Sequence, residues 1–253
     1  GQQAQGGILS QAAYGFKYIF ARPSLLGLQL IFFAGNLFTG IGFTVFAPMI
    51  LARTNSNSLV FGSVQTAGAI GAVIGGVAMS AWGGFKRRVH GVLFGWIVSG
   101  IGMAIVGLVG GLPVWMVGIV LAAIVGPLVN GSNQAIWQAK VAPDLQGRVF
   151  SARRLIAWFT SPISPIIGGA LADYVLEPSM KITSSPLSLI FGSLVGTGTG
   201  SGMGLLIFFC GLLGATVGLA GYFYPAIRNA EDILPDHDAL PKSDDAEHSA
   251  APS

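Results

Sequence analysis

The sequence predicts an all-α, polytopic membrane protein with six transmembrane helices, and three observations support this fold class. Of the 253 residues, 52% are hydrophobic and 9% are charged, whereas soluble globular domains carry about 25% charged residues. Several uncharged segments are long enough to cross a bilayer core, which requires about 20 apolar residues. The chain also contains 38 glycines, and glycine is frequent in transmembrane helices because it lets their backbones approach closely.

Residues 1–24 are expected to precede the membrane domain as a flexible lead and a surface helix. The lead is rich in Gln and Gly, and the segment from Ile8 to Phe20 has the pattern of a partly amphipathic helix. This segment is too short to cross a bilayer. Because it carries Lys17 and is followed by Arg22, it suits a helix that lies on the cytoplasmic membrane surface.

The membrane domain is expected to cover residues 25–226. Its longest uncharged run, residues 91–139, is too long for one helix and is divided at Gly110–Pro113, where helix breakers cluster. This division places Trp115 near one membrane interface and Trp137 near the other, as an aromatic belt requires. The six expected spans are residues 25–50, 59–82, 92–109, 114–136, 149–175 and 202–226.

Glycine spacing within two of these spans predicts close helix packing. Gly71 and Gly75 lie four residues apart in the second span, and Gly214 and Gly218 lie four residues apart in the sixth. Two small residues at this spacing form a flat stripe on one helix face. We therefore expect another helix backbone to lie against each stripe.

Two segments fall outside the expected spans. Residues 177–201 are predicted to form a loop, in which Pro186–Val195 is apolar but too short to cross, so that it is interfacial or re-entrant. Seven of the ten acidic residues follow residue 227. Residues 227–253, which are also rich in Pro, Ser and Ala, are predicted to be a disordered cytoplasmic tail.

The distribution of lysine and arginine predicts the orientation, because basic residues accumulate on the cytoplasmic side of a membrane protein. Arg53 and Lys181 lie on one side of the six spans, and the other side carries Lys17, Arg22, Lys86, Arg87, Arg88, Lys140, Arg148, Arg153, Arg154, Arg228 and Lys242. Eleven basic residues against two place both termini in the cytoplasm. We expect an integral protein of the bacterial inner (plasma) membrane.

The residue pattern argues against an enzyme. No ionisable residue lies in the body of a predicted span, and no spacing of His, Cys, Asp and Glu fits a metal site. No nucleophile and base occur as a pair, and nothing indicates a cofactor. The excess of basic residues reflects loops that fix orientation, so a nucleic-acid partner is not expected.

Uncharged polar residues in the spans are candidates for lining a substrate path. Amide side chains in a hydrocarbon environment need partners, so they face another helix or a water-filled cavity. Interhelical hydrogen bonding remains the alternative role for each of them. The substrate-path candidates are Gln29, Asn36, Gln65 and Asn130.

The fifth span is expected to be flexible. Pro162 and Pro165 each remove a backbone donor, and Gly168 and Gly169 follow within one turn. These four residues are candidates for a hinge or a close-packing face that changes during transport. The alternative is a static kink whose free carbonyl groups are satisfied by a neighbouring helix.

Two motifs of the chain resemble those of a known family. The first is Val141–Ser151, VAPDLQGRVFS, and the second is Pro165–Gly169, PIIGG. They are similar to a cytoplasmic loop and to the end of the antiporter motif in the major facilitator superfamily. Over about Tyr14 to Arg228, the chain resembles the C-terminal six-helix half of such a transporter, in the drug and macrolide/siderophore exporter branch.

The sequence also departs from that family. In its cytoplasmic-loop signature, Gly76, Gly83 and the basic run after Phe85 match, but Ser80 and Ala81 stand at the positions of the acidic and basic residues. The spans also lack the titratable carboxylate that a proton-coupled exporter needs. The resemblance therefore implies that this carboxylate belongs to an N-terminal six-helix half, from the same longer chain or a second copy.

The resemblance implies export of a small amphipathic organic molecule by an ion-gradient-driven, alternating-access carrier, of which this chain is one half. The alternative is a membrane-embedded anchoring or assembly module without a transport path. The expected partners are membrane lipid, the small-molecule substrate and the missing half. The basic residues expected to bind anionic lipid headgroups and to latch the cytoplasmic side are Lys86, Arg87, Arg88, Arg148, Arg153 and Arg154; simple positive-inside anchoring is the alternative. Asp144 and Gly147 are expected in the same cytoplasmic loop.

Overall fold

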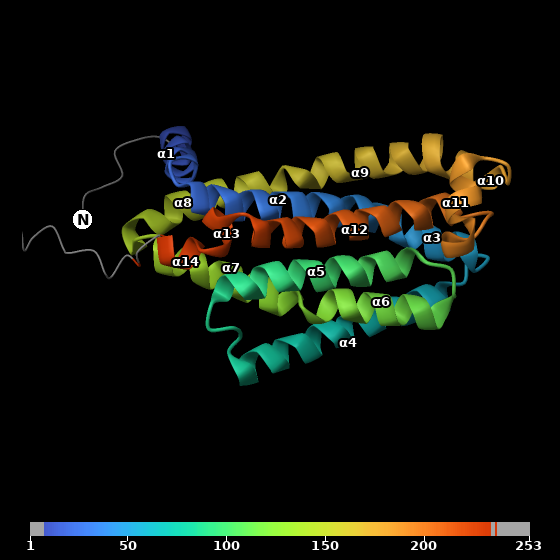
Figure 1. The fold of residues 1–253 in the computed structure, drawn as a ribbon, viewed down its shortest axis with the longest axis horizontal. Coiled ribbons are helices and arrows are strands. Elements are labelled where there is room, and N and C mark those ends of the chain that lie inside the picture. Colours follow the sequence, from blue (N-terminus) through green and yellow to red (C-terminus); the bar gives the residue numbers. More distant parts are fainter. Residues whose placement is uncertain (1–7, 234–235, 237–253) are drawn as a thin grey trace, which may run out of the picture.

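A computed structural model describes residues 8–233 and 236, and over these residues the chain is helical, without strands. Six of the described helical segments are long and apolar enough to cross a membrane, so the predicted fold class is confirmed. Figure 1 shows these segments running side by side along the length of the molecule. The six spans are Pro23–Arg53, Ser58–Trp82, Arg88–Gly107, Leu112–Lys140, Pro143–Lys181 and Ser201–Phe223.

Some spans consist of more than one helix. The single-helix spans are α4 (Ser58–Trp82), α5 (Arg88–Gly107) and α12 (Ser201–Phe223). The composite spans contain α2 (Pro23–Thr44) and α3 (Phe46–Arg53); α6 (Leu112–Ile124) and α7 (Gly126–Lys140); and α8 (Pro143–Trp158), α9 (Thr160–Ala170), a π-helical segment (Leu171–Leu176) and α10 (Glu177–Lys181). The remaining helices are α1 (Ile8–Phe20), α11 (Pro186–Val195), α13 (Pro225–Arg228) and α14 (Ala230–Ile233).

Prolines explain the breaks in the composite spans. The helices are interrupted at Val45, Val125 and Phe159, and a proline follows each break within three residues, at positions 48, 127 and 162. A proline lacks the amide hydrogen that would bond the carbonyl four residues earlier, and its ring crowds that carbonyl. The expected irregularity of the fifth span is therefore present, and the first and fourth spans contain comparable breaks that the sequence analysis did not predict.

The centre of the bundle is a glycine seam between α5 and α12, formed by Gly100, Gly107, Gly204, Gly211 and Gly218. A Cβ atom at Gly211 would lie 2.6 Å from the Gly100 carbonyl oxygen, and one at Gly218 would lie 2.7 Å from the Leu93 carbonyl oxygen. A Cβ atom at Gly107 would collide with the Gly204 carbonyl. These contacts recur every seven residues along both antiparallel helices, so the two backbones touch over most of their length.

The predicted glycine stripes differ in how closely they pack. A Cβ atom at Gly71 would lie 3.0 Å from the Val120 carbonyl oxygen of α6, and one at Gly75 would collide with Ile124. Gly218 belongs to the glycine seam, but a Cβ atom at Gly214 would approach no atom closer than 3.9 Å. Gly214 therefore has space for a larger residue.

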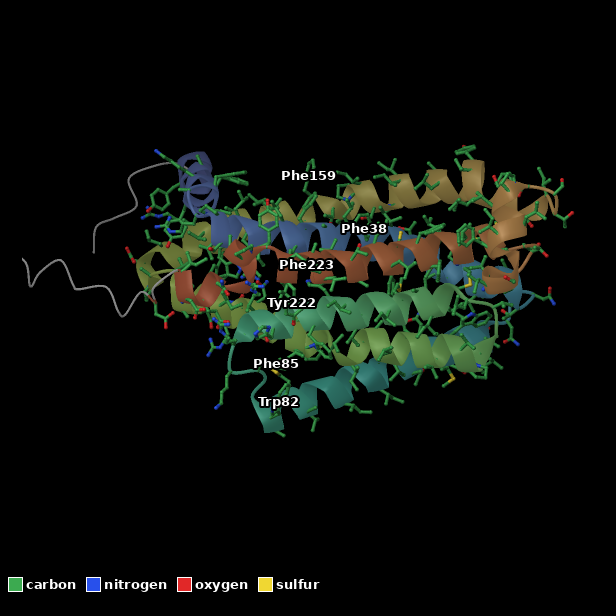
Figure 2. All side chains as sticks on the ribbon, viewed as in Figure 1. Phe38, Trp82, Phe85, Phe159, Tyr222 and Phe223 are labelled. Carbon is green, nitrogen blue, oxygen red and sulfur yellow. The ribbon has the colours of Figure 1, made fainter. Side chains whose placement is uncertain are left out.

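The two ends of the bundle have different compositions. Figure 2 shows that side-chain nitrogen and oxygen atoms gather toward both ends, whereas carbon predominates between them. We call the end with α1, α14 and the start of α8 the basic end, and the end with α10 and α11 the far end (Figure 1). At the basic end, α1 packs on α8, and Gly15 allows this contact because a Cβ atom there would collide with the Arg148 carbonyl.

At the far end, the segment from Glu177 to Ser201 is more ordered than the predicted loop. Its first residues extend the fifth span as α10, and Pro186–Val195 forms the short helix α11, which packs on α12. The Glu177 carboxylate is buried, with the residue 7% exposed, and accepts hydrogen bonds from the amides of Gly200, Gly202 and Met203 at 2.6, 3.0 and 3.3 Å. These amides begin α12 and would otherwise lack acceptors.

At the basic end, the first residues of the predicted tail are helical. Residues 230–233 form α14, where the sequence predicted disorder, because their acidic groups find fixed partners. A Glu231 carboxylate oxygen accepts a hydrogen bond from the Val89 amide at 3.0 Å, at the start of α5, and Asp232 pairs with Arg87. The Lys140 ammonium group donates to the Glu231 carbonyl at 2.6 Å and pairs with Asp236 at 2.8 Å. Residues 234–235 and 237–253 of the predicted tail lie outside the described residues.

The two tryptophans predicted to form an aromatic belt are instead buried. Trp115 is 3% exposed and Trp137 is 0% exposed, and they pack in two different apolar clusters of the bundle. Their indole N–H groups donate to the Leu108 carbonyl at 3.2 Å and to the Asn133 side-chain oxygen at 3.0 Å. Both tryptophans therefore act as core residues with satisfied donors.

Candidate functional site

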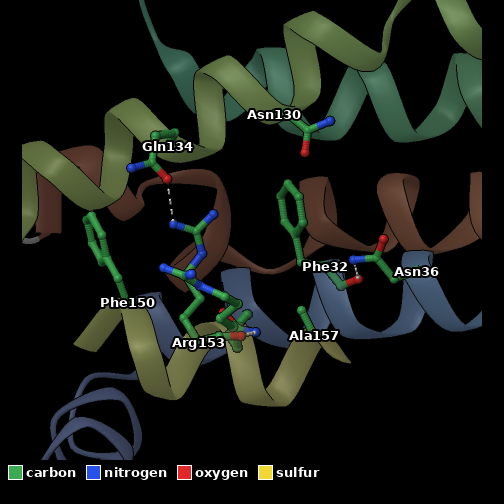
Figure 3. A pocket seen from close by; sticks show the side chains of 9 residues that line it. Phe32, Asn36, Asn130, Gln134, Phe150, Arg153 and Ala157 are labelled. Carbon is green, nitrogen blue, oxygen red and sulfur yellow. Dashed lines mark hydrogen bonds between the residues drawn. The ribbon is translucent and has the colours of Figure 1, made fainter. Parts of the chain in front are cut away.

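A polar pocket of about 270 Å³ opens near the basic end, between α2, α7 and α8. Figure 3 shows α7 on one side of this pocket, with α2 and α8 on the other. It brings together three segments that are far apart in the sequence. Its lining residues are Gln29, Phe32, Asn36, Asn130, Gln134, Phe150, Arg153, Arg154 and Ala157.

Arg153 is held in a defined position in this pocket. Its guanidinium group donates a hydrogen bond to the Gln134 side-chain oxygen at 3.1 Å, which links α8 to α7 (Figure 3). The same group lies 5.2 Å from the ring centre of Trp137 and 5.8 Å from that of Phe150. Aromatic faces attract cations at these distances. A guanidinium has five N–H donors, so Arg153 keeps donors for a ligand.

Besides Gln134, three amide side chains line the pocket, those of Gln29, Asn36 and Asn130. Gln29 is 2% exposed, and its amide nitrogen donates to the Arg153 carbonyl at 3.3 Å, but its side-chain oxygen is buried without a hydrogen-bond partner in the described part of the chain. The Asn36 and Asn130 amide nitrogens donate to carbonyls on their own helices at 2.8 and 3.0 Å. Figure 3 shows these two asparagines facing each other from opposite walls.

The electrostatic character of the polar pocket is positive. Arg153 and Arg154 both line it, and its described lining contains no Asp or Glu. Across residues 8–233 and 236, no carboxylate forms an ion pair with either arginine. The pocket therefore combines two cations with amide oxygens and two aromatic rings.

An apolar pocket, also about 270 Å³, lies further along α2 toward the far end. Its wall on α2 begins at Thr39, three residues after Asn36 of the polar pocket, so the two pockets lie in line along this helix. Gln65 contributes one of its few polar groups. The lining residues are Thr39, Phe43, Phe46, Gln65, Gly68, Ala69, Ser99, Met103, Ile119, Ala122 and Ala123.

The structure thus brings three of the four substrate-path candidates together in the polar pocket, and Gln65 lies in the apolar pocket. The hinge candidates Pro162, Pro165, Gly168 and Gly169 all lie on α9 and line neither pocket. Gly168 is buried and packs against α2, where a Cβ atom would lie 2.9 Å from the carbonyl oxygen of residue 41. A hinge role for these residues stays a prediction.

The residues predicted to form a cytoplasmic loop divide into two groups. Lys86 and Arg87 lie in the connection before α5, and Arg88 is the first residue of that helix. The others lie on a helix, because α8 begins at Pro143 with an acidic first turn, which is a favourable helix start. The residues on α8 are Asp144, Gly147, Arg148, Arg153 and Arg154.

Part of the pocket wall was not predicted from the sequence. Gln134 and Phe150 were not among the candidates, and Arg153 and Arg154 were assigned to lipid contact or anchoring. The spacing could have identified Gln134 as a pocket residue, because it lies four residues after Asn130 and therefore on the same face of a helix. The arginines carry no such signal, because a basic residue near the end of a span is the usual pattern of membrane orientation.

Comparison with curated proteins identifies distant relatives. Macrolide efflux protein A of Streptococcus pyogenes is 27% identical to this chain over 157 residues, which are 59% of the chain and 38% of the relative. The protein of the same name from a serotype M6 strain of that species matches with the same identity and coverage. The match therefore spans well under half the length of these relatives. No family model and no solved structure matches the chain.

Proposed function

We propose that this chain is a six-helix half of a major facilitator superfamily carrier that exports a small amphipathic organic molecule. The observation that carries this proposal is the pair of pockets along α2, one polar and cationic and the other apolar. An amphipathic molecule needs both environments next to each other. Small-molecule sites are typically concave and mostly apolar, with a few polar groups that fix orientation.

The similarity to proteins named for macrolide efflux supports a role in transport rather than catalysis. The fifth span adds support, because it contains helix breaks and a π-helical segment, and such irregular segments are frequent at functional sites. We propose that a second six-helix unit, from the same longer chain or a second copy, completes the site. That unit would supply the titratable carboxylate for coupling, because the described linings of the two pockets contain none.

We further propose that the basic end faces the cytoplasm of a bacterial cell and that the membrane is the plasma membrane. The described basic residues concentrate at this end, whereas Arg53 and Lys181 lie at the far end. In this orientation the polar pocket is nearest to the cytoplasm. A molecule leaving the cell would meet the polar pocket first and the apolar pocket second.

The test is efflux from cells that express the protein from its complete gene. Cells are loaded with an anionic, a cationic or a neutral fluorescent amphiphile, and retention is measured with and without an uncoupler. We expect faster loss of at least one amphiphile than in cells with empty vector, and we expect the uncoupler to abolish the difference. Retention equal to empty vector for all three amphiphiles would reject the exporter and leave the anchoring module as the remaining function.

A pair of variants tests whether the pockets carry the activity. Asn36→Leu keeps the branched shape of the side chain but removes the amide from the polar pocket, and we expect it to lower efflux at least fivefold. Thr216→Val is the matched control, because Thr216 is exposed on α12 and bonds only the carbonyl of residue 213 in the described contacts. Equal loss of efflux in both variants, at equal expression, would argue against the pockets as the path.

A further inference from the structure

We propose that the polar pocket binds the anionic head of an amphiphile, whose apolar body extends along α2 into the apolar pocket. The inference rests on the proposed function and deepens it, because it names the chemical class that the site holds. It depends on three observations: the positive charge of the pocket, the different contacts that its two arginines make, and one buried hydrogen-bond acceptor without a partner.

The charge of the pocket favours an anion over a cation. Arg153 and Arg154 contribute two positive charges, and the described lining offers no carboxylate to neutralise them. An organic cation entering this space would be repelled by both groups, whereas a carboxylate, phosphate or sulfonate would be attracted. Arginine also binds such oxyanions with two parallel N–H donors.

The two arginines differ in the contacts they make, and this difference suits the binding of an anion. Arg153 is fixed by Gln134 and by the rings of Trp137 and Phe150, so its charge is preorganised. Arg154 is exposed and makes no hydrogen bond or ion pair within residues 8–233 and 236. Its donors are therefore available to an incoming oxyanion, and binding requires no existing contact to break.

The buried Gln29 oxygen indicates a second feature of the ligand. This oxygen has no hydrogen-bond partner among the described residues although Gln29 is 2% exposed. A buried polar atom without a partner costs about 1–3 kcal/mol. Because Gln29 lines the pocket, a rotation of its side chain would bring this oxygen to a ligand that carries a hydroxyl or amide donor beside its anionic group, and the hydrogen bond would remove the cost. The predicted head is therefore an oxyanion with a neighbouring hydrogen-bond donor.

Two sources can supply this chemistry: an exported organic anion and an anionic phospholipid such as phosphatidylglycerol. The test uses the protein expressed from its complete gene, in nanodiscs of zwitterionic phosphatidylcholine. Its probes are two fluorescent amphiphiles with the same pyrene body, one ending in a carboxylate and the other in a quaternary ammonium group. Nanodiscs without protein correct for partition into lipid. We expect the carboxylate probe to bind at least tenfold more tightly than the ammonium probe.

Variants assign the binding to the pocket. Arg154→Gln is expected to weaken carboxylate binding about tenfold, as loss of a charge-assisted hydrogen bond does, and Arg154→Lys to restore most of it. Arg228→Gln is the control, because Arg228 is an exposed arginine at the same end that lines neither pocket. Tighter binding of the ammonium probe, or equal carboxylate binding by wild type and Arg154→Gln, would overturn the inference.

A lipid arm distinguishes the two sources. If phosphatidylglycerol added to the nanodiscs displaces the carboxylate probe, the head belongs to a lipid; if it does not, the head belongs to an exported anion, and both results support an anionic head. Failure of this inference is separate from failure of the carrier. Gradient-dependent efflux that Arg154→Gln does not affect would support the carrier and contradict the anionic site. Carboxylate binding that depends on Arg154, without efflux of any amphiphile, would support the anionic site and contradict the carrier.

Discussion

The guanidinium group of Arg53 donates a hydrogen bond to the carbonyl oxygen of Val195 at 2.6 Å, across 142 positions of sequence. It also donates to the Leu108 carbonyl at 3.1 Å. One side chain thus satisfies the last carbonyls of α5 and α11 while standing at the end of α3. Gly204 leaves the space for it, because a Cβ atom there would collide with the guanidinium.

The first prediction concerns this arginine. Arg53→Met leaves the carbonyl of buried Val195 without its donor, whereas the Leu108 carbonyl keeps the hydrogen bond from Trp115. We therefore expect the free energy of unfolding to fall by about 1–3 kcal/mol. Lys181→Met is the control, since Lys181 is 53% exposed and forms a 3.8 Å pair with Glu177; such pairs contribute about 0–1 kcal/mol. Thermal unfolding in detergent measures both. Equal stability of the two variants would show that Arg53 is not structural.

The second prediction concerns the cap of the last span. Glu177→Ala removes the acceptor of three α12 amides, and losing a helix cap costs about 0.5–2 kcal/mol. We expect faster hydrogen exchange at Gly200, Gly202 and Met203, measured by mass spectrometry in detergent. Asp173→Ala, at an exposed position of the fifth span, which also carries Glu177, should leave exchange at these three amides unchanged. Unchanged exchange in Glu177→Ala would contradict the capping role.

The third prediction tests the glycine seam. Gly211→Ala places a methyl group 2.6 Å from the Gly100 carbonyl oxygen, and overpacking of this kind costs about 1–3 kcal/mol. Gly214→Ala on the same helix has space, with the nearest atom 3.9 Å away, and should be neutral or slightly stabilising because alanine favours helix. Unfolding of the purified variants compares them. Similar losses at both positions would show that the close contact with the Gly100 carbonyl does not set the cost at Gly211.

The fourth prediction concerns α14. Lys140, whose side chain is 5% exposed, binds both the Glu231 carbonyl and Asp236. We expect Lys140→Met to release α14 and to speed proteolytic cleavage after Arg228, whereas Lys17→Met, at an exposed site on α1, should not. Limited proteolysis followed by mass spectrometry gives the rates. If both variants are cut at the wild-type rate, Lys140 does not hold the segment.

Local patterns in the sequence were sufficient for the fold class and for part of the site. Uncharged runs predicted six spans because a bilayer excludes charge over a fixed length. Gln29, Asn36 and Asn130 were selected because buried amides need partners, and they meet in one pocket. The breaks beside Pro48 and Pro127 were also readable, since each proline removes a backbone donor within a predicted span.

The remaining features depend on contacts between distant segments. Nothing near Arg53 in the sequence indicates that it bonds the carbonyls of Val195 and Leu108. From the sequence, a basic residue before a polar turn looks the same as one that only fixes the orientation of the protein in the membrane. Glu177 was assigned to a loop for the same reason. Arg153 and Arg154 line the polar pocket because α8 lies beside α2 and α7 there, and no pattern near these arginines in the sequence indicates either helix.

The glycine seam has a consequence for biosynthesis. Its two helices are separated by residues 108–200 in the chain, so after α5 the ribosome must complete the fourth and fifth spans and then synthesise the sixth before α12 can cover the glycine face of α5. At about 5–20 residues per second, this interval is on the order of 10 s. During that time the centre of the future bundle is lined by lipid or by an insertion factor, and a nascent chain released before residue 223 exposes a surface that membrane quality control can recognise.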